Sequence, residues 1–239
     1  MARATRPYYY VNNDSSNLVG SSDINFEYFS GFSKEQKRKS IESMHKEISA
    51  KFNKDKAKIL EISKASTDYL GQKLSAFNLI LNLNDGSRNV KASVERFFQG
   101  SKKFQNGGPF DELFFNDALH PKRYEGLKES GDFIGFELFG KSYDTTPKTY
   151  FYDWLYITAL KQNKDLTINL SEYEFFTDIE FNPKKSFSCQ AKSVALFLGL
   201  QKEGILEKVT KDADSFLEFY KTQIEYKTQI EKDASLELY

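Results

Sequence analysis

The sequence predicts a single domain of the α+β class, predominantly α-helical with a small β-sheet. Its 239 residues are enough for one large domain with a closed core. Apolar side chains recur at helical spacing, for example at Ile41, Met44 and Ile48. Strand-like apolar residues precede the tight-turn pair Asp85-Gly86 in the segment LSAFNLILNLNDGSRNV. We therefore expect several helices around one core, with a few strands beside them.

The N-terminal part of the chain is expected to form an extended arm followed by a helix. Residues 1–22 are polar and rich in Asn and Ser, so they predict an arm that is anchored, if at all, through the three tyrosines at 8–10. In S-K-E-Q, the hydroxyl of Ser33 is placed to cap the first helix, with Gln36 three residues later. Helical spacing puts His45 on the apolar side of this helix, where a packing role is expected.

The middle of the chain predicts a strand at 59–62 and then a helix that Ser93 caps, with Glu95 in its first turn. The run Gly107-Gly108-Pro109 is expected to end that helix. After Pro147, the segment TYFYDWLYITALKQN is apolar on nearly every face and predicts a central helix. The main body is therefore expected to extend over residues 23–205.

The remaining segments predict further helices, near 166–170 and at 191–204, and a helical tail over 206–239. The tail contains the repeat YKTQIE at 220–225 and again at 226–231. Two copies of six residues cannot form a solenoid, so a solvent-facing helix without a catalytic role is expected there.

Composition limits the classes of function. Thirty-four basic and thirty-four acidic residues cancel, so a nucleic-acid substrate would have to be held by a local basic patch. A single cysteine, Cys189, excludes an intramolecular disulfide and is expected to be a packing residue, and with only two histidines a His/Cys metal cage cannot form. No metal or redox cofactor is therefore expected. The chain has neither a signal-peptide start nor about 18 consecutive apolar residues, so a cytoplasmic protein without membrane contact is expected.

One cluster of polar residues has a spacing that suggests chemistry. Glu95, Gln99 and Lys102 would share one face of a helix, which would bring a carboxylate, an amide and an amine together. Such spacings also occur on solvated helix faces. The neighbouring Phe97 and Phe98 favour a helix that packs against a core.

The same segment resembles the NADAR family. NADAR domains have a Ser/Phe element, a turn with Asp-Gly, and a helix that reads Ser/Thr-x-Glu-x-x-Phe/Tyr-Gln-x-x-Lys-x-Phe. This chain has Ser75-Ala76-Phe77, then Asp85-Gly86, then SVERFFQGSKKF over 93–104. One departure is Ala76, because compact members commonly carry Asn there. The segments GFSKEQKRKSI, FYDWLYITAL and FTDIEFNPKKSFSCQA resemble the longer NADAR proteins encoded beside DarT-type toxins, which ADP-ribosylate guanine in DNA.

This resemblance implies an antitoxin that hydrolyses ADP-ribosyl-guanine in DNA, with a cognate DarT-type toxin as a possible partner. Two alternatives remain: an N-glycosidase for small ribosylated metabolites of riboflavin biosynthesis, and a non-catalytic protein that binds ADP-ribose or the toxin. The resemblance implies no cofactor, and the sequence leaves the oligomeric state open.

A cleft is expected between the helix of Glu95 and an acidic loop at 176–185. Lys102 is the expected nucleophile or proton carrier, Glu95 its charge partner and Gln99 a ribose contact. Asp153 lies in a very apolar helix and must find a partner or hold a raised pKa, so it is either a catalytic acid or part of a structural ion pair. The other candidates are the loop acids Asp178 and Glu180 for catalysis, and Ser75, Phe77, Gly107, Gly108, Trp154 and Asn182 for substrate binding.

Overall fold

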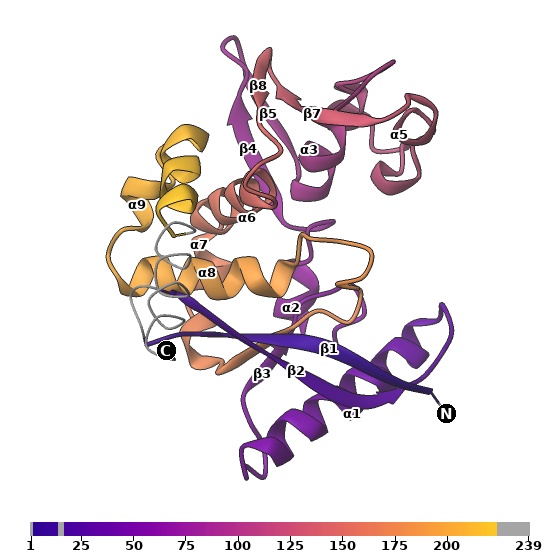
Figure 1. Ribbon diagram of the computed structural model, residues 1–239, viewed down its shortest axis with the longest axis vertical. Helices are drawn as coiled ribbons and strands as arrows, with labels where there is room; N and C mark the ends of the chain where they lie inside the picture. Colours follow the sequence, from indigo (N-terminus) through magenta and orange to yellow (C-terminus); the bar gives the residue numbers. More distant parts are fainter. Residues whose placement is uncertain (1, 14–16, 224–239) are drawn as a thin grey trace, which may run out of the picture.

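The computed structural model describes residues 2–13 and 17–223 and has the predicted α+β architecture (Figure 1). The described residues form three small sheets, with strand orders β2-β1-β9-β3, β4-β5 and β6-β7-β8. The strands are β1 (Ala2–Val11), β2 (Val19–Tyr28), β3 (Ile59–Glu61), β4 (Ile80–Asn84), β5 (Asn89–Ser93), β6 (Lys102–Phe104), β7 (Phe133–Leu138), β8 (Lys141–Tyr143) and β9 (Phe175–Thr177). The helices are α1 (Lys34–Lys51), α2 (Tyr69–Lys73), α3 (Val94–Gly100), α4 (Glu112–Phe115), η1 (Pro121–Arg123), α5 (Gly126–Glu129), α6 (Tyr150–Gln162), α7 (Lys164–Thr167), η2 (Leu170–Glu172), α8 (Gln190–Lys202) and α9 (Leu206–Val209).

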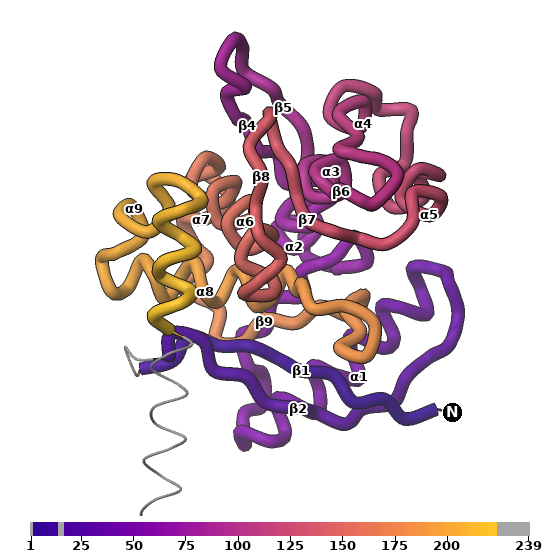
Figure 2. The backbone as a smooth tube through the Cα atoms, turned by 45° about the horizontal axis from the view of Figure 1, so that its top comes forward, coloured from indigo at the N-terminus to yellow at the C-terminus, as the bar shows by residue number. Residues whose placement is uncertain are grey.

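The N-terminal segment is part of the largest sheet. Strand β1 pairs with β2 in antiparallel register from Ala2 opposite Tyr28 to Val11 opposite Val19, and Tyr9 pairs with Phe176 of β9. Tyr8 and Tyr9 are buried, on opposite faces of the strand. Helix α1 lies along β2 and begins as predicted, because the Ser33 hydroxyl accepts a hydrogen bond from the Gln36 amide (Figure 2).

The core is built on α6 and α8. Both helices are buried over most of their length, and they pack against each other. The sequence-based prediction of a central apolar helix after Pro147 is confirmed. After α9, the chain forms a further helical segment up to residue 223, in which Phe216 is fully buried against this core. The second copy of YKTQIE and the last two residues of the first copy lie outside the described residues.

The structure corrects the expected length of α3. Ser93 caps this helix as predicted, but the helix ends at Gly100 instead of continuing to Gly107. The helix ends because the Gly100 carbonyl accepts a hydrogen bond at 2.6 Å from the Phe110 amide, which lies outside the helix. Position 100 is a glycine because a side chain there would meet the ring of Phe114. The next residues form β6, which pairs with β7. Lys102 is therefore on a strand and not on the helix of Glu95.

Within residues 2–13 and 17–223, none of the helices is both long and apolar enough to cross a bilayer.

Candidate active site

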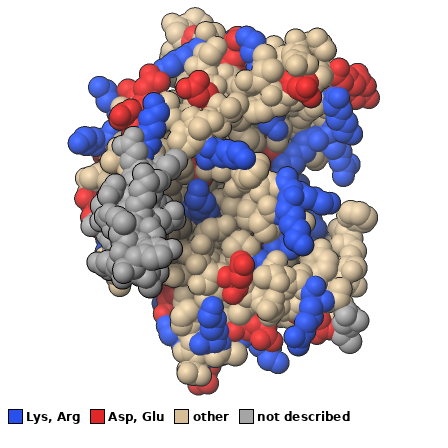
Figure 3. Space-filling view, in the orientation of Figure 1, with Lys and Arg blue, Asp and Glu red and all other residues tan. Residues whose placement is uncertain are grey.

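A cleft of about 800 Å³ opens beside α3 and β6. Its walls come from four parts of the chain: α3 with β6 and β7, the short helices η1 and α5, the segment before α6 together with the first turn of that helix, and the loop before α8. Aromatic rings make up much of the wall: Phe98, Phe104, Phe136, Phe151 and Tyr152 are buried or half-buried. Two further rings at the cleft, Phe133 and Phe187, are exposed. In Figure 3, lysine and arginine side chains gather around the hollowed centre of this face.

The charge of the cleft is strongly positive although the chain as a whole is neutral. Asp144 is the one carboxylate among its lining residues, whereas five lysines line it: Lys102, Lys122, Lys128, Lys148 and Lys185. Within the described part of the chain, only Lys122 of these five has a carboxylate oxygen within 4.0 Å. Unpaired amines in a concave, aromatic-lined site favour an anionic ligand with planar rings.

Lys102 is the lysine whose chemistry the site changes most. Burial lowers the pKa of its ammonium group, the charge of Lys122 lowers it further, and Glu95 opposes both effects. Its Nζ lies 5.1 Å from the centre of the Phe98 ring. A desolvated lysine is neutral more often than an exposed one, so this side chain is suited to act as a nucleophilic amine.

Glu95 and Gln99 lie on the buried side of α3, as the sequence predicts. The Gln99 amide donates a hydrogen bond to Glu95 Oε1 at 2.8 Å, and Lys122 Nζ is 3.6 Å from Oε2. The Glu95 amide donates to the Ala76 carbonyl at 2.9 Å, so the segment 75–77 holds the start of the helix. The Glu95 carboxylate is therefore held in place near Lys122, and its charge also raises the pKa of Lys102.

The segment before β4 contributes two of the expected binding residues. Lys64 and Lys122 place their ammonium groups 3.9 Å and 5.0 Å from the centre of the Phe77 ring. The Ser75 hydroxyl is fully buried and has no hydrogen-bond partner among the described residues. Lys122 contacts both the Phe77 ring and the Glu95 carboxylate, so Phe77 lies close to Glu95. Ser75 lies in the protein interior.

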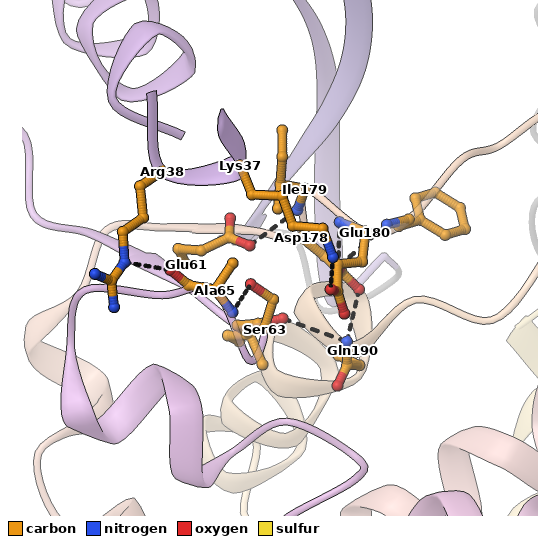
Figure 4. Close-up of polar contacts among 11 residues, drawn as sticks. Lys37, Arg38, Glu61, Ser63, Ala65, Asp178, Ile179, Glu180 and Gln190 are labelled. Atoms are coloured by element: carbon orange, nitrogen blue, oxygen red, sulfur yellow. Dashed lines mark hydrogen bonds and ion pairs between the residues drawn. The ribbon is translucent and has the colours of Figure 1, made fainter. Parts of the chain in front are cut away.

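Asp178 is buried, and Gln190 connects it to the segment 75–77 (Figure 4). Its Oδ1 accepts hydrogen bonds from the amides of Glu180 and Phe181, and its Oδ2 accepts one from Gln190 Nε2 at 3.0 Å. Burial raises the pKa of Asp178 to about 6, although the hydrogen bond from Gln190 opposes the rise. Gln190 Oε1 accepts from the Ala76 amide at 2.6 Å, so one side chain connects the acidic turn to the segment that holds α3.

Glu61 is a second buried carboxyl group near Asp178, and no local pattern in the sequence predicts its role. Glu61 Oε1 accepts a hydrogen bond from the Ile179 amide at 2.9 Å, and Oε2 accepts one from the Thr177 hydroxyl at 2.7 Å. The same hydroxyl is 2.9 Å from His45 Nε2. Burial and the nearby Asp178 raise the pKa of Glu61 to about 7, and burial lowers the pKa of His45 to about 4. His45 thus has the packing role that its position on α1 suggested.

Two other residues of the acidic loop, Glu180 and Asn182, have partners of their own. Glu180 forms an ion pair with Lys37 of α1 (Figure 4). Asn182 Oδ1 accepts a hydrogen bond from the Lys184 amide at 3.1 Å and so shapes the loop that carries Lys185 into the cleft.

Asp153 is fully buried but does not line the cleft. Its carboxylate accepts hydrogen bonds from Thr149, Ser193 and Tyr220 and lies 3.4 Å from Lys192 Nζ. This arrangement is the structural ion pair that was one of its two expected roles.

Trp154, Gly107 and Gly108 also lie outside the cleft lining. Trp154 stacks on Tyr143 at 6.1 Å in the core. Gly108 has a φ of +79°, and a side chain there would approach the Lys102 carbonyl to 2.2 Å. Gly108 therefore packs against the main chain of β6, and the Gly107 carbonyl accepts a hydrogen bond from the Phe104 amide of the same strand at 2.8 Å.

Fold and cleft together define an α+β protein with a basic, aromatic-lined site that contains a desolvated lysine near the buried carboxylate of Glu95. The sequence model of the DarT1-associated NADAR antitoxins matches residues 4–230. The chain therefore belongs to this family of antitoxins, as its motifs suggested, and NADAR proteins are known for N-glycosidase activity. A comparison with curated protein sequences gave no match.

Proposed function

We propose that this antitoxin hydrolyses the N-glycosidic bond between ADP-ribose and the exocyclic amine of guanine in nucleic acid, and so reverses the modification made by a DarT-type toxin. The observation that carries the proposal is the environment of Lys102. Its amine is desolvated, the charge of Glu95 acts on it, and it lies in a cleft whose lysines Lys128, Lys148 and Lys185 have no carboxylate partner among residues 2–13 and 17–223.

The cleft matches the substrate in charge and shape. A diphosphate needs positive charge that is not already neutralised, and Lys128, Lys148 and Lys185 offer it. Adenine and guanine need flat apolar surfaces, and the less exposed rings of the wall, such as Phe98 and Tyr152, supply them. A volume of about 800 Å³ is within the usual range for ligand sites.

In the proposed reaction, the neutral Lys102 amine attacks the anomeric carbon of the ribose. The bond from that carbon to the guanine amine breaks, and the amine takes up one proton that the lysine nitrogen loses. The bond from the anomeric carbon to the ring oxygen then breaks, the oxygen takes up the second proton of the lysine nitrogen, and the opened sugar stays on Lys102 as an imine. Water then adds to the imine carbon, which releases ADP-ribose and restores the free amine. Glu95 stabilises the positive charge that develops at the anomeric carbon. Asp178 is buried and does not line the cleft, and its hydrogen bond from Gln190, which also binds the Ala76 amide, supports a role in positioning the segment that holds α3.

The test is release of ADP-ribose from an oligonucleotide that contains ADP-ribosylated guanine, measured by chromatography and mass spectrometry. We expect turnover by the wild-type protein and a loss of at least about 100-fold in kcat for Lys102→Ala. Lys103→Ala is the matched control, because Lys103 is the next residue of β6 but pairs with Glu137 at 2.5 Å and does not line the cleft.

Three results would contradict the proposal or part of it. Binding without turnover, unchanged in Lys102→Ala, would indicate a reader of ADP-ribose. Turnover of small ribosylated heterocycles but not of the oligonucleotide would favour the metabolite N-glycosidase. Borohydride added during turnover should trap the sugar on Lys102, and turnover without such an adduct would indicate direct attack by water.

A further inference from the structure

Exposed apolar side chains are concentrated at the cleft. Three of the eight exposed large hydrophobic residues in the described part of the chain line it: Phe133 at 41%, Ile134 at 53% and Phe187 at 63% exposed. Single exposed apolar residues are common on protein surfaces and need no explanation. Three around one cleft, none of them required by the reaction proposed above, indicate a contact surface for a ligand.

The three residues come from two separate parts of the fold. Phe133 and Ile134 are on β7, whereas Phe187 is on the loop between β9 and α8 (Figure 2). Phe133 is held by edge contacts to Phe136 and Phe104, with ring centres 5.0 Å and 5.8 Å apart. For Phe187, the contact found is with Lys148, whose Nζ is 4.1 Å from the ring centre, and much of its ring surface stays open to solvent.

Unpaired positive charge accompanies these side chains. Lys128, Lys148 and Lys185 line the same cleft, and within residues 2–13 and 17–223 none of them has a carboxylate oxygen within 4.0 Å. Aromatic rings alternating with free lysines are how proteins hold single-stranded nucleic acid, because the rings stack on bases and the lysines neutralise phosphates. The bases of a duplex are stacked on one another and cannot offer a free face to an isolated ring.

We propose that Phe187, together with Phe133 and Ile134, stacks on the nucleobases that flank the modified guanine, so that the cleft binds a single-stranded stretch of polynucleotide. This inference rests on the proposed function, since it assigns the surroundings of the same site. The occupant is a neighbouring base of the strand and not the adenine of ADP-ribose, because the exposed rings are additional to the aromatic wall inside the cleft.

The experiment compares two substrates: ADP-ribosylated guanine within a single-stranded oligonucleotide and the same group on a free nucleoside. Phe187→Ala should lower kcat/KM for the oligonucleotide by about 5- to 150-fold, the range expected for loss of one stacked base, and should leave the nucleoside reaction within about twofold. Phe187→Trp should retain activity on the oligonucleotide. Phe32→Ala is the control, because Phe32 is fully exposed and does not line the cleft.

An equal loss on both substrates would overturn the inference, because Phe187 would then contact the ADP-ribosylated nucleoside itself. Unchanged oligonucleotide turnover would overturn it as well. Binding of an unmodified single-stranded oligonucleotide at low salt, followed by fluorescence anisotropy, separates this inference from the proposed function. We expect Phe187→Ala to weaken that binding and Phe32→Ala to leave it unchanged, whether or not the wild-type protein releases ADP-ribose. Equal binding by both variants would refute the stacking role.

Discussion

The buried pair of carboxyl groups, Glu61 and Asp178, allows a prediction of how stability depends on pH. Replacement of Glu61 by Gln keeps the shape of the side chain. Its Oε1 still accepts the hydrogen bond from the Ile179 amide. Its new amide group donates to the Thr177 hydroxyl, which then turns to donate to His45. The substitution therefore removes a titratable group with little change in the hydrogen-bond geometry.

The expected effect follows from the raised pKa of Glu61. Since the pKa is about 7 in the folded protein and 4.5 is the ordinary value, the folded state binds more protons than the unfolded state between these two pH values. Stability then falls as pH rises through this window, and above it the charged Glu61 costs the fold about 3 kcal/mol. Glu61→Gln does not carry this cost. The variant should therefore be close to the wild type near pH 5 and more stable by about 2–3 kcal/mol near pH 8.

The measurement is urea unfolding of both proteins at several pH values between about 5 and 8. Glu207→Gln is the control, since Glu207 is largely exposed and its replacement should give no pH-dependent difference. A Glu61→Gln protein that is less stable than the wild type by the same amount at every pH would refute the reasoning. It would mean that Glu61 is a hydrogen-bonding group whose ionisation the fold does not penalise.

Two further predictions concern the support of the site. Gly108→Ala should reduce activity and stability, because the new methyl group would lie 2.2 Å from the Lys102 carbonyl. Gly140→Ala is the control: its φ of +76° is similar but the space around it is open, so it should lose stability only. Equal activity of the two variants in the ADP-ribose release assay would argue against a supporting role for Gly108. Lys192→Met should destabilise the protein by about 3–5 kcal/mol in urea unfolding, because it leaves Asp153 buried and unpaired. The double variant Lys192→Met/Asp153→Asn should regain most of that stability and keep normal turnover. A double variant that is folded but inactive would show that Asp153 is a catalytic residue.

Local signals in the sequence predicted much of this fold. The hydroxyl caps at Ser33 and Ser93 depend on residues only three positions away, so they can be recognised directly. The continuous apolar character of α6 similarly predicts its burial. These features need no knowledge of which segments meet in space. The turn at Asp85-Gly86 belongs to the same class, because it lies between β4 and β5 as the sequence indicated.

The position of Lys102 shows where local reasoning stops. Helical spacing placed Lys102 beside Glu95 and Gln99, but the helix ends at Gly100, where Phe114 packs too closely for a side chain. Lys102 lines the cleft from β6. Its position there is set by the pairing of β6 with β7, in which Lys102 lies opposite Phe136. The residue types were recognisable from the motif, whereas the geometry that joins them depends on contacts with segments far along the chain.

The same limit explains why Glu61 and Gln190 were not predicted as part of the site. Gln190 contacts residues 114 and 128 positions away, and Glu61 accepts bonds from residues 116 and 118 positions away. The one weak signal in the sequence is that Gln190, a polar residue, is the first residue of α8, whose following residues are mostly apolar.

Gln190 also explains the departure at Ala76, where compact NADAR proteins commonly carry Asn. In this chain the Ala76 side chain is buried, its amide donates to Gln190 and its carbonyl accepts from the Glu95 amide. Both main-chain groups of Ala76 thus form structural hydrogen bonds, which connect α3 to the turn of Asp178 through Gln190. A ligand contact from this position would have to come from a neighbour, and Phe77, beneath Lys64 and Lys122, is the one that borders the charged groups of the site. The loss of the Asn side chain is therefore compatible with an active site, because the main-chain contacts that hold Glu95 and Asp178 in place do not depend on it.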